Sequence, residues 1–209
     1  MKNEKCKICR SLGVKLFLKG EKCFLPKCTM IRKPYLPGQK GKKPQRSFSE
    51  YKKELKEKQK LKNWYFLKEN QFRKYADKAL RARGKVDDAS ALLIQVLESR
   101  LDNVIFRLGF AKSRLLARQL VSHGHILVNN KSVNIPSFLV KKGDLISLKP
   151  SSAKKTIFTN LSSALKKQDS PSWLKLSAEK LEAEVLGVSN LKEAAPPVEV
   201  SSIFEHYSR

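Results

Sequence analysis

The spacing of apolar residues predicts helices through the middle of the chain. Residues 50–61 place Glu and Lys four positions apart, which is typical of a solvent-exposed helix. Residues 66–84 place five apolar side chains on one helical face: Phe72, Tyr75, Ala76, Ala79 and Leu80. Residues 87–109 continue at the same spacing, and we expect them to form a helical run that belongs to the hydrophobic core.

After residue 109 the pattern changes to a short helix followed by strands. Ser113 is a suitable N-cap for a helix over residues 114–123, and Gly124 is placed to end that helix in the left-handed conformation. Residues 125–135 then alternate apolar and polar around Asn129-Asn130, a pair that tolerates the positive φ of a tight hairpin turn. Further short apolar runs follow, so the sequence predicts a helix pair and a small sheet.

These patterns divide the chain into predicted segments. In chain order they are a cysteine-containing knuckle with a basic arm (1–49), a helical domain (50–96), a helix-pair-plus-sheet domain (97–160) and an irregular tail (161–209). One helical piece is expected near residues 177–187, and residues 165–209 are expected to rejoin the helical domain. The expected fold class is α+β.

Composition adds a large positive charge to this picture. The formal net charge is +25 and the pI is near 10.1, so a polyanion such as nucleic acid is the expected partner. A membrane surface would also attract this charge, but no apolar run approaches the roughly 18 residues of a spanning helix. No signal-peptide core follows the first residues, and we expect a cytoplasmic protein without membrane partners. Residues 166–209 differ, because their net charge is −1, and we expect them to face protein or solvent.

All four cysteines lie near the start of the chain, at Cys6, Cys9, Cys23 and Cys28. Two thiolate pairs on short turns suit the tetrahedral geometry of a structural zinc site. Two disulfides and an iron–sulfur cluster are alternatives that the spacing also allows. Four protein ligands would leave no open position for a substrate, so even a bound metal would be structural rather than catalytic.

Residues 31–49 are rich in Pro, Gly and basic residues and cannot form a packed core. A flexible linker is one interpretation. We favour an extended arm that orders against phosphates, with Tyr35 and Phe48 available to stack on bases. Its candidate RNA-binding residues are Lys33, Lys40, Lys42, Lys43 and Arg46.

Two further sets of residues are candidates for RNA contact, although each basic residue alone could be a solvated surface charge. The first surrounds the helix that begins at Ser113, where free backbone N–H groups attract anions; it comprises Lys112, Ser113, Arg114, Arg118, His123 and Lys131. The second lies on the helical domain and comprises Arg73, Lys74, Arg81 and Arg83. His123 and His125 have no neighbouring acid in sequence, so we expect His123 to face RNA and His125 to pack, with no catalysis.

Residues 97–148 resemble the S-four RNA-binding domain, and other stretches extend the resemblance to the bacterial-type ribosomal protein S-four family. These stretches are KLFLKG at 15–20, KPYLPGQKGKK at 33–43, EKQKLKNWYFLKENQFRKYADKA at 57–79 and EHYSR at 205–209. The resemblance covers nearly the whole chain in order. The cysteine pattern resembles the zinc-carrying branch of the family, although Cys6 follows only five residues where many members have a longer start.

The resemblance implies a non-enzymatic protein of the small ribosomal subunit. Its members bind small-subunit rRNA early, help fold the 5′ domain, and lie beside ribosomal proteins S-three and S-five near the channel through which mRNA enters. Some contribute to decoding accuracy. Two other classes stay open from the residues: an RNA-modifying enzyme that carries this domain, such as a pseudouridine synthase, and a non-ribosomal RNA-binding stress factor.

Overall fold

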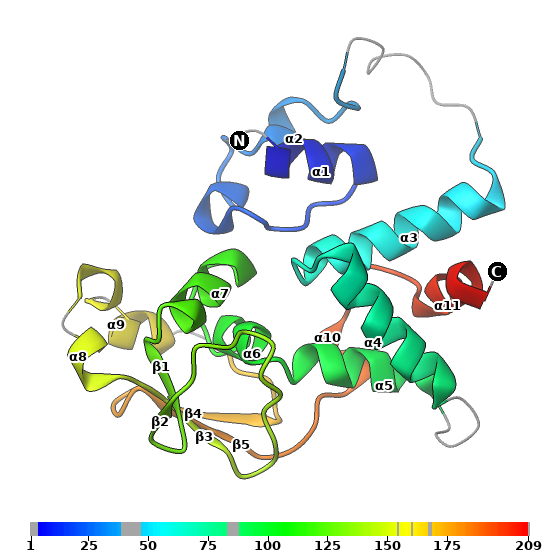
Figure 1. Ribbon diagram of the computed structural model, residues 1–209. Helices are drawn as coiled ribbons and strands as arrows, with labels where there is room; N and C mark the ends of the chain where they lie inside the picture. The colour runs from blue at the N-terminus through cyan, green and yellow to red at the C-terminus, as the bar shows by residue number, and fades with distance from the viewer. Residues whose placement is uncertain are drawn as a thin grey trace. The chain divides into compact units, whose positions relative to one another are not determined.

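The computed structural model describes the chain as two compact units (Figure 1). Unit 1 is formed by residues 1–93 and 195–209, and unit 2 by residues 94–194. The described residues are 4–38, 47–82, 88–153, 155–159, 161–166 and 169–208. The predicted boundary near residue 96 therefore lies close to the observed one, whereas the last segment is shared between the units.

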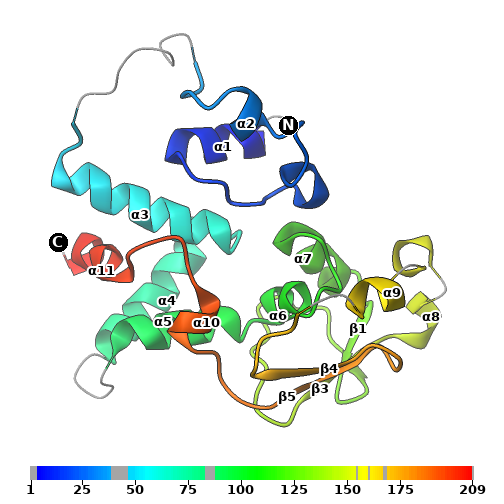
Figure 2. The ribbon, with the colours of Figure 1, turned by 180° about the vertical axis from the view of Figure 1, so that it is seen from behind.

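Unit 1 is helical in its described parts. Its helices are α1 (Glu4–Leu12), the 3-10 helix η1 (Gly20–Cys23), α2 (Thr29–Arg32), α3 (Glu50–Trp64), α4 (Glu69–Arg81), the start of α5 (Ala89–Glu98) and α11 (Val200–Ser208). α11 packs along α3 and α4, and α1 packs on α2 and α3. Figures 1 and 2 both show α11 lying beside α3, so the end of the chain returns to the helical domain as the sequence predicts.

The apolar pattern of α4 explains how the helix is oriented. Phe72, Ala76 and Ala79 are buried on one face, while Arg73 and Lys74 are exposed on the other. A second apolar cluster joins α1 to the loop that follows it, with Leu12, Leu16 and Leu18 buried. The helices predicted over residues 50–61 and within 66–84 are confirmed.

Glu69 joins three helices of unit 1. Lys58 Nζ donates to Glu69 Oε1 at 2.7 Å and Lys62 Nζ donates to Oε2 at 2.8 Å. Tyr207 Oη also donates to Oε1, at 3.3 Å. Burial raises the pKa of Glu69, but the hydrogen bonds and charges of the two lysines outweigh it and lower the pKa to about 2. The ionised carboxylate therefore stabilises the packing of α3, α4 and α11.

This shifted pKa predicts a pH-dependent contribution to stability. A depressed carboxyl pKa stabilises the fold above the ordinary value near 4.5, and the benefit disappears as pH falls toward about 2. Glu69→Gln should therefore lower the free energy of unfolding at pH 7 and make little difference near pH 2. Denaturant unfolding at several pH values measures this, with Glu205→Gln on the exposed face of α11 as the control. A difference between wild type and Glu69→Gln that stays constant from pH 7 to pH 2 would contradict the assignment.

Unit 2 contains a five-stranded antiparallel sheet in the order β2-β1-β3-β5-β4. The strands are β1 (Ile126–Val128), β2 (Lys131–Ser132), β3 (Leu145–Leu148), β4 (Leu174–Ser177) and β5 (Glu182–Val185). Its helices are the end of α5, α6 (Leu101–Arg107), α7 (Arg114–Ser122), α8 (Pro150–Ala153), the 3-10 helix η2 (Thr156–Phe158), α9 (Leu161–Leu165) and α10 (Leu191–Ala194). This mixture of helices and antiparallel sheet is the α+β class that the sequence predicts.

Helices α6 and α7 pack on each other and lie on one side of the sheet (Figures 1 and 2). Apolar side chains that are fully buried in this core include Ile105 on α6, Val121 on α7, Ile126 on β1 and Ile146 on β3. The β1–β2 turn holds Asn129 and Asn130 at φ of +50° and +63°, which is the backbone of the predicted type of hairpin turn.

The prediction of an irregular tail with a helical piece near residues 177–187 is wrong. Residues 174–185 form the β4–β5 hairpin, and β5 pairs with β3 through Ile146–Ala183. The segment is rich in Ala, Glu, Lys and Leu, which favour helices, yet Ala183 and Val185 alternate with exposed or half-buried glutamates. Burial of these side chains against the core, together with pairing to β3, outweighs the local helix propensity.

The helical run predicted over residues 87–109 is two helices. The chain leaves the helical conformation at Arg100, which forms a bridge with Leu139 and is fully buried. Its guanidinium donates to Asp102, with Nη2–Oδ2 at 2.6 Å and Nε–Oδ1 at 3.0 Å. A buried bidentate ion pair of this kind gives no periodic signal in the sequence.

Candidate nucleic-acid interface

The start of α7 has the geometry predicted for it. Ser113 has extended backbone angles, and its hydroxyl accepts a hydrogen bond from the backbone N–H of Leu116 at 3.2 Å. Lys112 is exposed immediately before this cap. The first turn of the helix thus combines a satisfied cap with a neighbouring cation, although Ser113 itself is 8% exposed.

The side chain of Arg114 is less exposed than we expect for a residue that contacts RNA. Its side chain is buried, and Nε donates to Asn103 Oδ1 at 2.8 Å. The guanidinium also lies over the ring of Phe106, with Cζ 4.4 Å from the ring centroid. Arg114 therefore joins α7 to α6 and is less accessible to a phosphate than the exposed Lys112, His123 and Lys131.

The end of α7 brings a histidine and a hairpin together. His123 is exposed at the C-cap, whereas His125 is buried, with Nδ1 2.9 Å from Ser152 Oγ. Burial lowers the pKa of His125, and the charges of Lys155, His123 and Lys149 lower it further. Packing of His125 is confirmed, and its surroundings favour the neutral ring.

Gly124 allows this change of direction, because its φ is +68°. A Cβ at this position would meet Ser132 Oγ of β2 at 3.6 Å, an ordinary contact, so conformation rather than space requires glycine. Gly124→Ala should therefore destabilise the chain by about 1–2 kcal/mol. Gly187→Ala in the same unit is the control, since no atom lies within 4 Å of its Cβ position and its φ is not in the left-handed region. Equal midpoints for the two variants in chemical denaturation would contradict this role.

Several exposed cations of unit 2 lie on or near α7 and the first hairpin. Lys112, His123 and Lys131 are exposed, and Arg118 is half-buried. The structure adds Lys149 and Lys155, which are exposed and whose charges reach His125. Sequence reasoning missed these two because they follow β3 and α8, segments that come next to the hairpin only through the pairing of β1 with β3.

Unit 1 presents its own candidate residues on α4. Arg73, Lys74 and Arg81 are exposed there, and Arg73 lies 3.9 Å from Asp77 in a weak ion pair. Lys33 is exposed after α2. The other candidates, Lys40, Lys42, Lys43, Arg46 and Arg83, lie outside the described residues.

The two aromatic residues that the sequence offered for stacking are already in contact with cations of unit 1. The Arg10 guanidinium lies 4.9 Å from the ring centroid of Tyr35 and donates to the backbone carbonyl of the same residue. Lys56 Nζ lies 3.6 Å from the ring centroid of Phe48, and Lys52 Nζ lies 4.7 Å from it. These rings therefore fix the basic arm against α1 and α3 at its two described ends.

The four cysteines come together in unit 1 as free thiols. Cys6, Cys9, Cys23 and Cys28 line one small cavity of about 20 Å³, with lysines and apolar side chains completing its wall. A cavity of this size has room for one water-sized occupant. Among the described residues, no group of three or more His, Cys, Asp or Glu has its donor atoms arranged to hold a metal ion.

The pKa of a thiol in this cavity depends on its burial and on the charges of the neighbouring cysteines. Burial raises the pKa of Cys9, and the charges of Cys23, Cys6 and Cys28 raise it further. At Cys6 burial also acts to raise the pKa, but hydrogen bonds to Thr29 and Lys19 prevail and lower it. Four thiols that repel one another as thiolates in one cavity are a donor set that a soft cation would neutralise.

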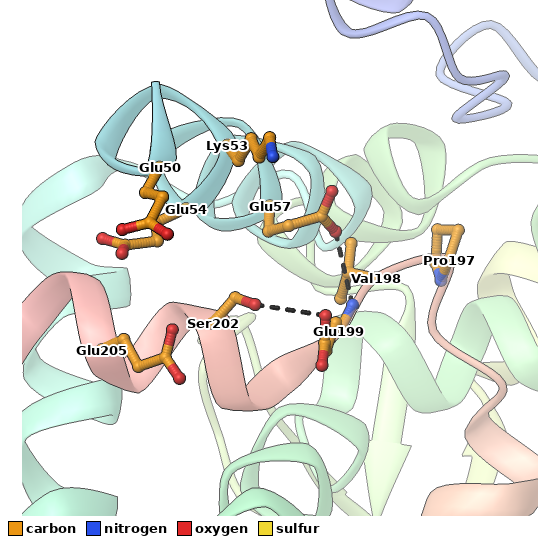
Figure 3. Close-up of a pocket in the computed structure, with 9 residues that line it drawn as sticks. All are labelled: Glu50, Lys53, Glu54, Glu57, Pro197, Val198, Glu199, Ser202 and Glu205. Carbon is orange, nitrogen blue, oxygen red and sulfur yellow. Dashed lines mark hydrogen bonds between the residues drawn. The ribbon is translucent and has the colours of Figure 1, made fainter. Parts of the chain in front are cut away.

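A groove of unit 1 has the opposite charge from the rest of the chain (Figure 3). It has a volume of about 700 Å³ and is lined by residues of α3, of α11 and of the segment that leads into α11: Glu50, Lys53, Glu54, Glu57, Pro197, Val198, Glu199, Ser202 and Glu205. Figure 3 shows Glu57 accepting a hydrogen bond from the backbone N–H of Glu199, at 3.3 Å. Five carboxylates make this surface unsuitable for phosphates.

The matches to known families follow the division of the chain. Residues 99–146 match the S4 domain, and residues 1–98 match the ribosomal protein S4/S9 N-terminal domain. Among the helices in the described part of the chain, none is both long and apolar enough to cross a membrane. Helix α7 and the cations Lys112, Arg118, His123 and Lys131 therefore lie within the part of the chain that matches the S4 RNA-binding domain.

Curated relatives match along almost the whole length. A small ribosomal subunit protein uS4 of Caldicellulosiruptor bescii is 45% identical over 204 residues, covering 98% of this chain and 96% of the relative. The uS4 protein of Thermus thermophilus is 43% identical over the same share of each chain. A protein named uS4A from Bdellovibrio bacteriovorus is 44% identical with equal coverage. The chain belongs to the small ribosomal subunit protein uS4 family, whose members are structural RNA-binding proteins rather than enzymes.

Proposed function

We propose that this chain is a structural component of the small ribosomal subunit and binds small-subunit rRNA. The single observation that carries the proposal is similarity to uS4 proteins over 98% of the chain. The net charge of +25 and the exposed cations around α7 supply the physical means. An RNA-modifying enzyme would need a separate catalytic domain, and the two family matches leave no such segment between residues 1 and 146.

Binding would rest on electrostatic attraction and on shape. Exposed cations such as Lys112, Lys131 and Lys149 in unit 2 would displace counterions from phosphates, which makes affinity fall steeply with salt. Folded RNA is read mainly through its backbone, its 2′-hydroxyls and its unpaired bases. A chain that binds folded rRNA in this way would help the 5′ domain of the rRNA to fold early in assembly, as the family resemblance implies.

The cysteine cavity would hold a structural metal ion, and zinc suits four thiolates best. Cys6, Cys9, Cys23 and Cys28 all line the cavity, and α1, η1 and α2 carry or adjoin them. A zinc ion there would neutralise the thiolates and cross-link these short elements. An iron–sulfur cluster is the alternative for the same ligands.

The acidic groove favours a protein neighbour over RNA on that side of unit 1. Its carboxylates lie on α3, on α11 and just before α11, and two of them, Glu199 and Glu205, belong to the tail that has a net charge of −1. A basic segment of another ribosomal protein would complement them. Ribosomal proteins S-three and S-five, with mRNA near its entrance to the subunit, are the neighbours that the resemblance implies.

Direct binding to purified small-subunit rRNA tests the proposal. The dissociation constant should rise steeply as salt increases from 50 to about 200 mM, and a variant with Lys112, Lys131 and Lys149 changed to Ala should show a shallower salt slope. Substitution of Lys175, Lys180 and Lys192, exposed on other parts of unit 2, is the matched control. Equal affinity for rRNA and for an unrelated RNA of the same length would reject specific binding.

A further inference from the structure

Phe24 is the most exposed large apolar side chain of the described residues, at 71%. It lies directly after η1, and its backbone N–H donates to the carbonyl of Glu21 at 2.9 Å, which fixes the position of its backbone. An aromatic ring of this size is usually buried, because water contact is unfavourable. Its exposure on a backbone held in place by a hydrogen bond indicates that a binding partner covers this surface.

The ring of Phe24 is already stacked on one partner. Its centroid lies 4.9 Å from that of Phe17, and the two ring planes differ by 31°. Phe17 has a φ of +53°, a conformation that is uncommon for a bulky residue and costs energy. Backbone strain of this kind persists where the surrounding structure requires it. Here the strained residue, Phe17, is the one whose ring contacts Phe24.

Lysines lie close to this pair of rings in space or in sequence. Lys15 Nζ lies 5.3 Å from the ring centroid of Phe17. Lys22 and Lys27, which flank Phe24 in sequence, are exposed, and Lys19 is half-buried nearby. Aromatic faces set among lysines are the combination that binds single-stranded nucleic acid, since the rings stack on bases while the cations contact phosphates.

We propose that Phe24, supported by Phe17, is a stacking platform for an unpaired base of the RNA that the chain binds. This inference rests on the proposed function and adds a specific contact to it. Leu25 and Ile31 are also exposed, at 50% and 57%, so an apolar contact with a protein is the competing use of this surface. The local excess of lysine favours RNA, because a positively charged rim attracts phosphates.

Three substitutions at Phe24 separate these uses, measured by binding to purified small-subunit rRNA at fixed salt. Phe24→Ala and Phe24→Leu should each weaken binding about 5- to 150-fold, the range for loss of one base stack. Phe24→Trp should bind as tightly as wild type. None of the three changes a charge, so the salt slope should stay the same. Leu25→Ala, in the same loop, is the control and should bind like wild type.

The possible results distinguish failure of the Phe24 stacking platform from failure of the proposed function. If the wild-type chain does not bind the rRNA, the proposed function fails and the platform fails with it. If wild type binds and Phe24→Leu binds equally well, a flat aromatic face is unnecessary and the platform alone is overturned. If Leu25→Ala loses as much affinity as Phe24→Ala, the surface is a general apolar contact and the proposal is also overturned. Thermal unfolding should show that each variant folds, because Phe24 is 71% exposed and its substitutions remove only the contact with Phe17.

Discussion

Replacing Asp102 with alanine is expected to lower the free energy of unfolding by about 3–5 kcal/mol, because it leaves the Arg100 guanidinium buried without its carboxylate. The side chains of Arg100 and Asp102 are 1% and 6% exposed, and the shorter of their contacts is 2.6 Å. Arg100 also holds the bend between α5 and α6 through its bridge to Leu139. Chemical denaturation followed by circular dichroism measures the loss.

A double substitution makes this expectation sharper. Arg100→Met combined with Asp102→Leu removes both charges, so its cost should be well below the sum of the single variants. Asp77→Ala breaks the exposed Arg73–Asp77 pair, and it should change the free energy of unfolding by no more than about 1 kcal/mol. This expectation would be contradicted if the double variant lost as much free energy of unfolding as the sum of the two single variants. It would also be contradicted if Asp77→Ala lost as much as Asp102→Ala.

Removal of the zinc ion that we propose for the cysteine cavity is the second large effect we expect. The free energy of metal binding to four thiolates is on the order of 10 kcal/mol or more, and it is folding energy for a segment with so small a core. Chelation should therefore raise hydrogen exchange in residues 4–38 to nearly unfolded rates while β1 and β3 stay protected. Elemental analysis of the protein as purified without oxygen should give one zinc per chain.

Two cysteine variants keep this prediction testable. Cys9 is buried among apolar residues, so Cys9→Ser disturbs packing as well as metal binding. Cys6 is half-buried, and Cys6→Ser removes a ligand with less effect on the core. Both variants should lose zinc. Iron with visible absorbance would instead indicate a cluster, and purified wild-type protein without either metal would contradict the site.

The sequence predicted the elements whose signals are local. Ser113, Gly124 and the Asn129-Asn130 pair carry their conformations in their own chemistry, and the structure confirms the cap, the left-handed residue and the turn. The apolar face of α4 is likewise visible from its spacing. The RNA-facing roles of Lys112, Arg118 and Lys131 stay predictions, although the structure leaves these side chains at least partly exposed.

Features that depend on distant segments could not be predicted in this way. The β4–β5 hairpin has helix-forming composition and becomes a strand pair only because β3 offers an edge to pair with. Arg114 looked like a surface cation, yet Asn103 and Phe106 of α6 enclose it. The acidic groove likewise joins residues of α3 to residues more than 140 positions later, which only folding brings together.

Co-sedimentation with small ribosomal subunits tests the central claim most directly. The tagged chain, expressed in a bacterial host and separated on a low-salt gradient, should migrate with the small subunit and remain there after washing at moderate salt. A chain that stays at the top of the gradient, or that follows bulk RNA without preference for the small subunit, would contradict the proposed role.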